Sequence, residues 1–197
     1  MPRGPRQLLD GGSYHLIARG NNRQVVFARP EAFEHFRFLL LRAKRRYPSR
    51  LYHYCLMSNH LHLLLQIETA EHLPKFMQGL LQGFGRWYKH LAPFSGHLWQ
   101  GRYKSPLISH ESYFLEAGRY IERNPLRAKL VADLNDYRWS SYPVYALGAV
   151  DPLVDADPYY APLGATSAAR RRAYREFVRL DSPYAPVLDT HFLDTAF

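Results

Sequence analysis

Two apolar runs separated by only two residues constrain the fold of this chain more than any other feature. Residues 50–57 read RLYHYCLM and residues 60–67 read HLHLLLQI, with the turn-forming pair Ser58–Asn59 between them. Both runs are rich in aromatic and aliphatic residues and have the length of strands. The pattern predicts an antiparallel β-hairpin whose second strand carries His60 and His62.

The two histidines share one face of this predicted strand, because side chains alternate along a β-strand. Leu61 and Leu63 then point to the other face, toward an apolar core. A rise of about 3.3 Å per residue puts the two imidazoles close enough to bind one metal ion. An isolated His-x-His pair is more often structural than metal-binding, so its meaning depends on the residues that accompany it.

The remaining segments complete a predicted α+β fold. We expect a strand at residues 13–20, helices at 30–47, 73–91 and 111–124, and a fourth strand at 96–109. The helix at 111–124 is expected to stop at Pro125, which lacks a backbone N–H. This order predicts a ferredoxin-like split β-α-β fold with a central antiparallel sheet and helices packed on it, on one face. A C-terminal extension follows.

The composition changes near residue 148, which divides the chain into two predicted parts. Residues 1–148 are expected to form one domain, and residues 149–197 an extension with a basic helix, SAARRRAYREFVRL. The 197 residues include 26 Lys plus Arg against 17 Asp plus Glu, a formal charge of +9. This surplus favours a polyanionic partner such as nucleic acid.

Cysteine content and hydropathy bear on the compartment. The chain has one cysteine, Cys55, which excludes an intrachain disulfide and suits a reducing environment. We find no apolar stretch of signal-peptide or membrane-spanning length. We therefore expect a cytoplasmic protein without a membrane partner.

The helix expected at 111–124 offers side chains that could complete a site with the two histidines. A two-histidine metal site needs at least one further ligand. Polar and tyrosine side chains gather within about 80° on one side of this helix, at ~100° per residue: Tyr113, Glu116, Tyr120 and Asn124. If this side faces the histidine strand, Asn124 could bind or orient a metal ion beside the hydroxyl of Tyr120.

Taken together, these segments resemble the single-strand tyrosine transposases, the HUH-type enzymes of insertion sequences and their REP-associated relatives. The resemblance rests on YHYCLMSNHLHLLLQ, YIERNPLRAKLV and YRWSSY, which stand in the family order within residues 10–148. It implies that His60 and His62 bind a metal, that Tyr120 is the nucleophile and that Asn124 is the third ligand. Some relatives carry Gln where this chain has Asn124.

The resemblance also implies a reaction. A divalent metal, Mg²⁺ or Mn²⁺, polarises the scissile phosphate of single-stranded DNA. The tyrosine oxygen attacks phosphorus, displaces a 3′-hydroxyl and leaves a 5′-phosphotyrosine, whose bond energy allows the strand to be rejoined. Histidine ligands alone would also accept zinc. The implied partner is single-stranded or hairpin DNA. Members of the family act as dimers or as monomers, so the resemblance leaves both a homodimer and a monomer open.

Two segments of the sequence suit contacts with a DNA strand. ARGNNRQ presents polar side chains on a loop, suited to phosphates and base edges: Arg19, Asn21, Asn22 and Arg23. HLWQGRYKS combines aromatic rings with positive charge, a mixture that suits single-stranded DNA: Trp99, Tyr103, Arg102 and Lys104. The basic helix of the extension is a third candidate, and a solvated helix face explains it equally well.

Two other functions are compatible with parts of the sequence. A catalytically silent, hairpin-DNA-binding regulator would keep the same fold, although the trio His60, His62 and Tyr120 argues against loss of activity. A phosphate-handling hydrolase of the histidine-triad kind shares the look of HLHLLL. That motif needs a third histidine where this chain has Leu64.

Overall fold

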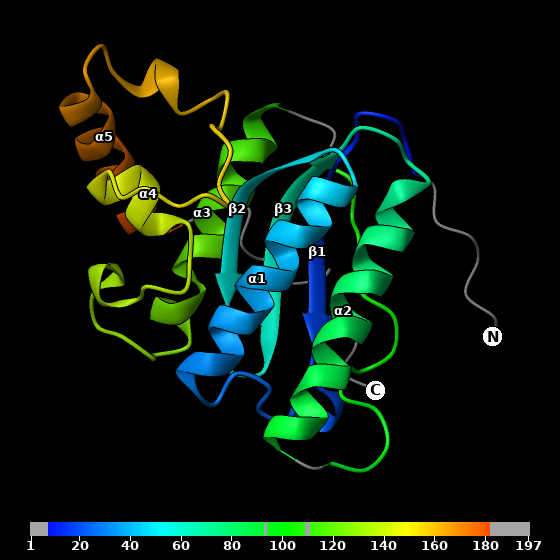
Figure 1. Ribbon diagram of the computed structural model, residues 1–197. Coiled ribbons are helices and arrows are strands. Elements are labelled where there is room, and N and C mark those ends of the chain that lie inside the picture. The colour runs from blue at the N-terminus through cyan, green and yellow to red at the C-terminus, as the bar shows by residue number, and fades with distance from the viewer. Residues whose placement is uncertain (1–7, 93, 109–110, 182–197) are drawn as a thin grey trace.

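A three-stranded antiparallel sheet lies at the centre of the structure, a computed structural model that describes residues 8–92, 94–108 and 111–181 (Figure 1). The strands are β1 (Ser13–Arg19), β2 (Ser49–Leu56) and β3 (His60–Ile67), in the order β1-β3-β2. The predicted α+β fold with its central antiparallel sheet is confirmed, and so is the hairpin of β2 and β3.

β3 is the central strand, so the alternation of its side chains decides what each face of the sheet carries. Leu61, Leu63 and Leu65 are fully buried on one face. His60 and His62 lie on the other face, as the alternation predicts.

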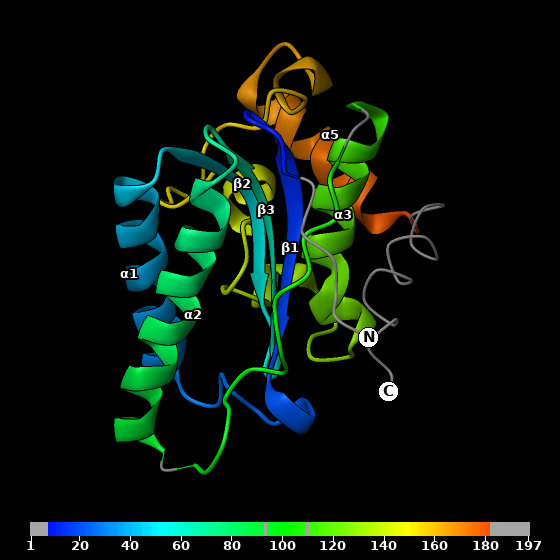
Figure 2. The same cartoon turned by 90° about the vertical axis from the view of Figure 1, so that its right-hand side faces the viewer.

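Two helices cover the leucine face, α1 (Pro30–Arg46) and α2 (His72–Leu91) (Figure 2). Pro30 stands in the first turn of α1, where its missing N–H costs nothing. Both helices turn apolar side chains to the sheet at helical spacing: Phe33, Phe36 and Leu40 from α1, and Leu73, Met77, Leu80 and Phe84 from α2. Burial of each such side chain stabilises the fold by about 1.5–3 kcal/mol.

The third long helix, α3 (Glu111–Arg127), covers the histidine face, so helices lie on both faces of the sheet (Figure 2). The expectation that all helices share one face is wrong. The physical reason is that the histidine face is also largely apolar. Cys55 and Leu64 are fully buried there, and α3 covers them with Ala117 and Ile121.

α3 also runs past Pro125, contrary to the prediction that it ends at Asn124. Pro125 cannot donate a hydrogen bond to the carbonyl of Ile121, four residues back. The side-chain amide nitrogen of Asn124 donates to this carbonyl, at 3.3 Å, and to that of Tyr120, at 2.8 Å. The asparagine therefore replaces the lost backbone donor and lets the helix continue.

The predicted fourth strand is the second correction to the sheet. In its described part, residues 96–108, the chain meets β1 only at isolated bridges: Gly20 with Trp99, Ile17 with Lys104, and Tyr14 with Leu107. Gly101 has φ +66°, which turns the chain away from an extended path. Pro106 removes a donor from the edge. The segment borders the sheet without forming a regular strand.

The chain beyond α3 adds α4 (Tyr142–Leu147) and α5 (Ser167–Arg179). Three short 3₁₀ helices complete the described elements: η1 (Asn21–Arg23), η2 (Leu134–Asp136) and η3 (Ala161–Leu163). α5 is the predicted basic helix, and it packs against α3 and α4. The boundary at residue 148 stays a prediction, and residues 182–197 of the predicted extension lie outside the described part. No helix in the described ranges has the length and apolarity needed to cross a membrane.

A buried ionic cluster joins β2, α3 and the extension. His53 lies between two carboxylates, with Nδ1 2.8 Å from Glu122 and Nε2 2.8 Å from Asp157, and all three side chains are fully buried. Burial opposes the charged imidazole, but the hydrogen bonds with Asp157 and Glu122 outweigh it and raise the pKa of His53 to about 9. His53 is therefore protonated at neutral pH.

This raised pKa predicts that the protein loses stability in mild alkali. A histidine with a folded-state pKa of about 9 contributes fully below its unfolded pKa of ~6.5, and this contribution is lost as the pH rises through 9. The loss should reach about 3 kcal/mol. Thermal unfolding followed between pH 6.5 and 9.5 should show a steady fall in Tm. A Tm that is flat or rising across this window would contradict the assignment.

Candidate active site

Three histidine rings meet on the face of the sheet that α3 covers. His60 and His62 have ring centroids 5.0 Å apart, with the rings nearly perpendicular. His15 of β1 joins them, with its Nε2 2.9 Å from Nδ1 of His62. His15 was not among the predicted site residues, although strand alternation could have found it. Ile17 lies directly opposite His62, so His15 is the diagonal neighbour on the same face.

Tyr120 of α3 lies against two of these rings. Its ring centroid is 5.9 Å from that of His62 and 5.8 Å from that of His15, edge to face in both cases. The helix can approach the sheet closely because Gly118 has no side chain: a Cβ there would stand 2.7 Å from Nε2 of His53. The structure thus brings the predicted nucleophile and the predicted histidine ligands together, from segments sixty residues apart.

Asn124 lies one helical turn beyond Tyr120, at the same end of α3. Its side-chain amide nitrogen donates hydrogen bonds to the carbonyls of Tyr120 and Ile121. The amide oxygen is thus the atom of Asn124 that could bind a metal, while the nitrogen holds the helix together.

The lowered pKa values of His60 and His62 suit metal binding. Burial, with the nearby charge of Arg19, lowers the pKa of His60 to about 4. Burial and the neighbouring His60 and His15 hold the pKa of His62 well below its usual value. Both imidazoles are therefore neutral at neutral pH, which is the form that ligates a metal.

The donors present fit a divalent ion that keeps open positions. Across the described part of the chain, no group of three or more His, Cys, Asp or Glu side chains is placed to hold a metal. Two neutral nitrogen donors and the Asn124 oxygen would leave positions for water or phosphate oxygens. An ion such as Mg²⁺ or Mn²⁺ accepts such oxygen ligands readily.

Arg127 is a second residue near the site that the sequence reasoning missed. Its guanidinium carbon lies 5.0 Å from the centre of the Tyr120 ring. It stands seven residues after Tyr120, which is two helical turns, and so occupies the same side of α3. This spacing was visible in the sequence, but the expected helix end at Pro125 concealed it. Arg127 places a positive charge over the predicted nucleophile.

The predicted DNA-contacting loop lies next to His60. Asn21, Asn22 and Arg23 form η1 and are exposed. Asn59 connects them to the histidines, because its Oδ1 is 2.6 Å from Nδ1 of His60 and its Nδ2 donates to the carbonyl of Arg23 at 3.3 Å. The loop and the histidine pair are therefore neighbours on the surface of the sheet.

Two further predicted residues lie along the edge of the same face. Arg19 is directly opposite His60 in the sheet, and its Nε donates to Oε1 of Gln100 at 2.9 Å. Lys104 bridges to Ile17, which in turn pairs with His62. Directly paired residues share a face, so Arg19 and Lys104 both belong to the histidine face.

Trp99 and Arg102 are not part of this group. The indole N–H of Trp99 donates to the carbonyl of Leu81 at 3.0 Å, and its ring packs 5.8 Å from that of Phe84, on the side of α2. Together with Arg102, Trp99 lines a groove with a volume of about 820 Å³ between α2 and residues 94–103. The predicted DNA-contacting residues thus fall into two sets, one beside the histidines and one in this groove.

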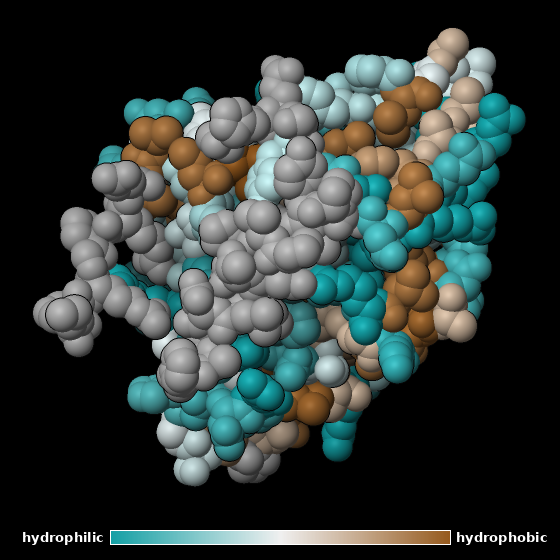
Figure 3. Space-filling view, turned by 180° about the vertical axis from the view of Figure 1, so that it is seen from behind, coloured by the Kyte–Doolittle hydropathy of each residue, from teal (hydrophilic) through white to brown (hydrophobic). Residues whose placement is uncertain are grey.

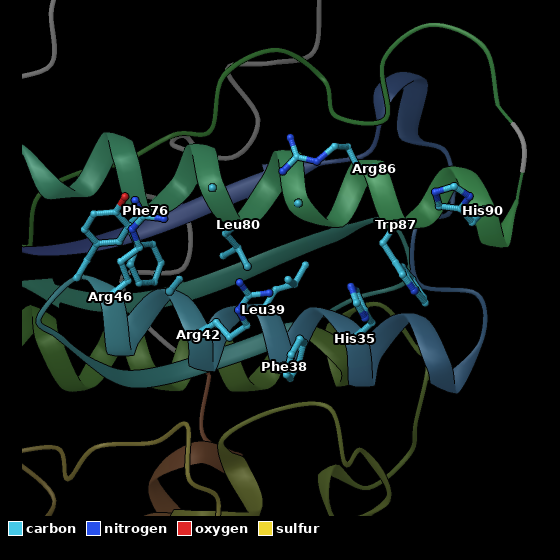
Figure 4. Close-up of a pocket in the computed structure, with 14 residues that line it drawn as sticks. His35, Phe38, Leu39, Arg42, Arg46, Phe76, Leu80, Arg86, Trp87 and His90 are labelled. Atoms are coloured by element: carbon cyan, nitrogen blue, oxygen red, sulfur yellow. The ribbon is translucent and has the colours of Figure 1, made fainter.

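A second groove lies between α1 and α2, on the far side of the sheet from the histidines (Figure 4). It has a volume of about 490 Å³, and Arg42, Arg46 and Arg86 line it. The ring of His35 stacks on that of Trp87 at its end, with centroids 4.1 Å apart. None of the predicted site residues lies in it.

The comparisons with known proteins concern the family and the fold of the chain. A sequence profile of a family described as IS200-like transposases matches residues 9–124. A structure of a REP-associated tyrosine transposase bound to a REP hairpin superposes with a TM-score of 0.65 at 18% identity, covering 80% of this chain and 92% of that one. A crystal structure of a candidate transposase from Deinococcus radiodurans R1 gives a TM-score of 0.42 at 23% identity, covering 66% of this chain and 91% of that one. No curated protein matches the sequence.

Proposed function

The chain belongs to the IS200-like transposases, a family of DNA transposase enzymes, and we propose that it cleaves and rejoins single-stranded DNA beside a hairpin through Tyr120. The observation that carries the proposal is the meeting of Tyr120 with the histidine pair, at 5.9 Å between the ring centroids of Tyr120 and His62. A buried tyrosine beside the neutral ring of His62 suits nucleophilic attack on a phosphate.

His60 and His62, with the Asn124 oxygen, would hold Mg²⁺ or Mn²⁺. When bound, such an ion supplies a Lewis acid that polarises the scissile phosphate. Tyr120 forms the new oxygen–phosphorus bond as the bond to the 3′-oxygen breaks. The phenol gives up its proton and the departing 3′-oxygen gains one. Arg127, above the Tyr120 ring, favours the negative charge that develops on the phenol oxygen.

The DNA strand is held by charge around the site. Arg19 and Lys104 would contact phosphates at the edge of the histidine face, and Asn21, Asn22 and Arg23 would contact the strand as it enters. Trp99 and Arg102 would hold a more distant part of the DNA in the groove along α2. On the face seen in Figure 3 the described residues are largely hydrophilic, with separate hydrophobic patches. The net charge of +9 favours a nucleic acid partner.

Replacing the nucleophile tests the proposal. The protein is incubated with hairpin-bearing single-stranded DNA and Mg²⁺ or Mn²⁺, and covalent protein–DNA adducts are resolved on a denaturing gel. We expect an adduct in the wild type and none in Tyr120→Phe, because phenylalanine has no oxygen to bond phosphorus. Tyr113→Phe, which changes another tyrosine of α3, is the matched control and should keep the adduct.

Two other outcomes would change the conclusion. An adduct that persists in Tyr120→Phe and disappears in Tyr113→Phe would move the nucleophile to Tyr113. Binding of hairpin DNA without cleavage at any metal concentration would favour the alternative function, a catalytically silent regulator that binds hairpin DNA. A homodimer and a cytoplasmic location stay predictions; the mass of the protein in solution, with and without DNA, tests the first of them.

A further inference from the structure

α3 presents two different sides to its surroundings. Tyr120 and Arg127 lie on the side of the histidines. The side chains of Arg119, Glu122 and Arg123 point elsewhere and are buried, with relative exposures of 3%, 0% and 8%. Charged groups are rarely buried unless other groups pair with them. All three of these have partners in the chain after residue 148.

Glu122 is the centre of the first set of contacts. One carboxylate oxygen is 2.8 Å from Nδ1 of His53 and accepts the hydroxyl of Ser141 at 2.5 Å. The other accepts the hydroxyl of Tyr174 of α5 at 2.8 Å. Asp157 holds the far nitrogen of His53 at 2.8 Å. Two residues of the extension, Asp157 and Tyr174, thus fix the surroundings of Glu122.

The two arginines form the second set of contacts. Arg123 donates to the carbonyls of Val178, at 2.7 Å, and Leu180, at 2.8 Å, where α5 ends. Arg119 donates to the carbonyl of Phe177 at 3.3 Å. Its guanidinium carbon lies 4.3 Å from the centre of the Phe177 ring. The last carbonyls of a helix lack partners within the helix, so these cations satisfy them.

These contacts fix the rotation of α3 about its own axis. Glu122 stands two residues after Tyr120, which places it roughly 200° further around the helix at ~3.6 residues per turn. A rotation that moved Tyr120 away from the histidines would pull Glu122 out of its cluster. Breaking a buried, hydrogen-bonded ion pair is strongly unfavourable, so such a rotation is resisted.

We propose that residues 149–181 position the nucleophile: through Asp157 and Tyr174 they anchor Glu122 and thereby hold Tyr120 beside His15 and His62. The family profile ends at residue 124, so both anchoring residues lie outside the part that it matches. The catalytic consequence rests on the proposed function, whereas the mechanical link between the extension and Tyr120 does not. Tyr174 and Asp157 are positioning residues in this proposal.

Two tyrosine-to-phenylalanine variants separate positioning from general stability. Tyr174→Phe removes the hydroxyl bonded to Glu122 and keeps the ring. Tyr160→Phe is the matched control, because it removes another hydroxyl of the extension, bonded at 2.7 Å to the carbonyl of Tyr145. In protein labelled with 3-fluorotyrosine, the ¹⁹F resonance of Tyr120 is assigned by its absence in Tyr120→Phe. We expect it to shift or broaden in Tyr174→Phe and to stay unchanged in Tyr160→Phe.

The same variants are compared in single-turnover adduct formation at saturating DNA. We expect Tyr174→Phe to slow the reaction about fivefold or more, with the Kd for DNA unchanged within about twofold, because a hydrogen bond to a charged group is lost without a change in the DNA surface. Glu122→Gln, which keeps the shape and removes the charge, should slow it further. Both rates are measured well below the thermal transition of each variant.

The ¹⁹F spectra and the adduct rates test the positioning proposal and its catalytic part separately. A Tyr120 resonance that is unchanged in both Tyr174→Phe and Glu122→Gln would overturn the proposal, and so would an equal shift in Tyr160→Phe. Wild-type adduct rates in both cluster variants would overturn its catalytic part. If the wild type forms no adduct on any hairpin substrate, the proposed function fails, and the ¹⁹F spectra still decide whether the extension positions Tyr120.

Discussion

The His60→Ala variant is expected to lose DNA cleavage almost completely while binding hairpin DNA nearly as well as the wild type. In the proposed site His60 is one of two neutral nitrogen donors, and a site left with a single histidine would be largely empty at millimolar Mn²⁺. Loss of the metal removes its stabilisation of charge on the phosphate, so the rate of adduct formation should fall by about 10³-fold. DNA affinity depends mainly on phosphate contacts by other residues, so Kd should change less than about threefold.

Two measurements make this prediction specific. Mn²⁺ binding followed by calorimetry should weaken in His60→Ala and remain unchanged in His90→Ala, which removes an exposed histidine at the end of α2. Adduct formation should follow the same pattern. Wild-type Mn²⁺ affinity in His60→Ala would show that His60 and His62 have a structural role and do not bind the metal. A loss of DNA affinity in proportion to the loss of cleavage would show that His60 contacts DNA directly.

The parts of the fold that depend on local periodicity could be predicted from the sequence. The β2–β3 hairpin and helices α1 and α2 appear at the expected positions, because alternation and helical spacing set them locally. The failures have nonlocal or compensating causes. The end of α3 was missed because the Asn124 side chain replaces the donor that Pro125 lacks. The fourth strand fails because Gly101 and Pro106 interrupt a segment whose side-chain pattern still alternates.

In the candidate site, too, the residues placed by local periodicity could be predicted and those placed by nonlocal packing could not. The predicted trio of His60, His62 and Tyr120 comes together, because strand alternation and helical spacing assign each residue to a face. The cluster around His53 could not be predicted in this way. Its partners Glu122 and Asp157 lie 69 and 104 residues away, and the immediate neighbours of His53 along β2 are two tyrosines. Only the packing of α3 and the extension over β2 brings these three groups into contact.

Gly118→Ala should be among the most destabilising single-methyl substitutions in this protein. The added Cβ would stand 2.7 Å from Nε2 and 2.8 Å from Cδ2 and Cε1 of His53. The ring cannot retreat, because both of its nitrogens are bonded to buried carboxylates. We expect a loss of about 3 kcal/mol of unfolding free energy. For a chain of this size, the Tm should fall by roughly 6–12 °C.

Gly79→Ala is the matched control for this prediction. Gly79 also stands inside a helix, α2, but nothing lies within 4 Å of a Cβ added there. Alanine favours the helix over glycine, so this variant should gain about 0.5–1 kcal/mol. The two substitutions change the same atoms, and their opposite signs would isolate the contact between α3 and His53. Equal Tm values for the two variants would mean that α3 can move away from the sheet at little cost. Tyr120, which reaches the histidines only because α3 lies this close, would then lack the fixed position that the proposed reaction needs.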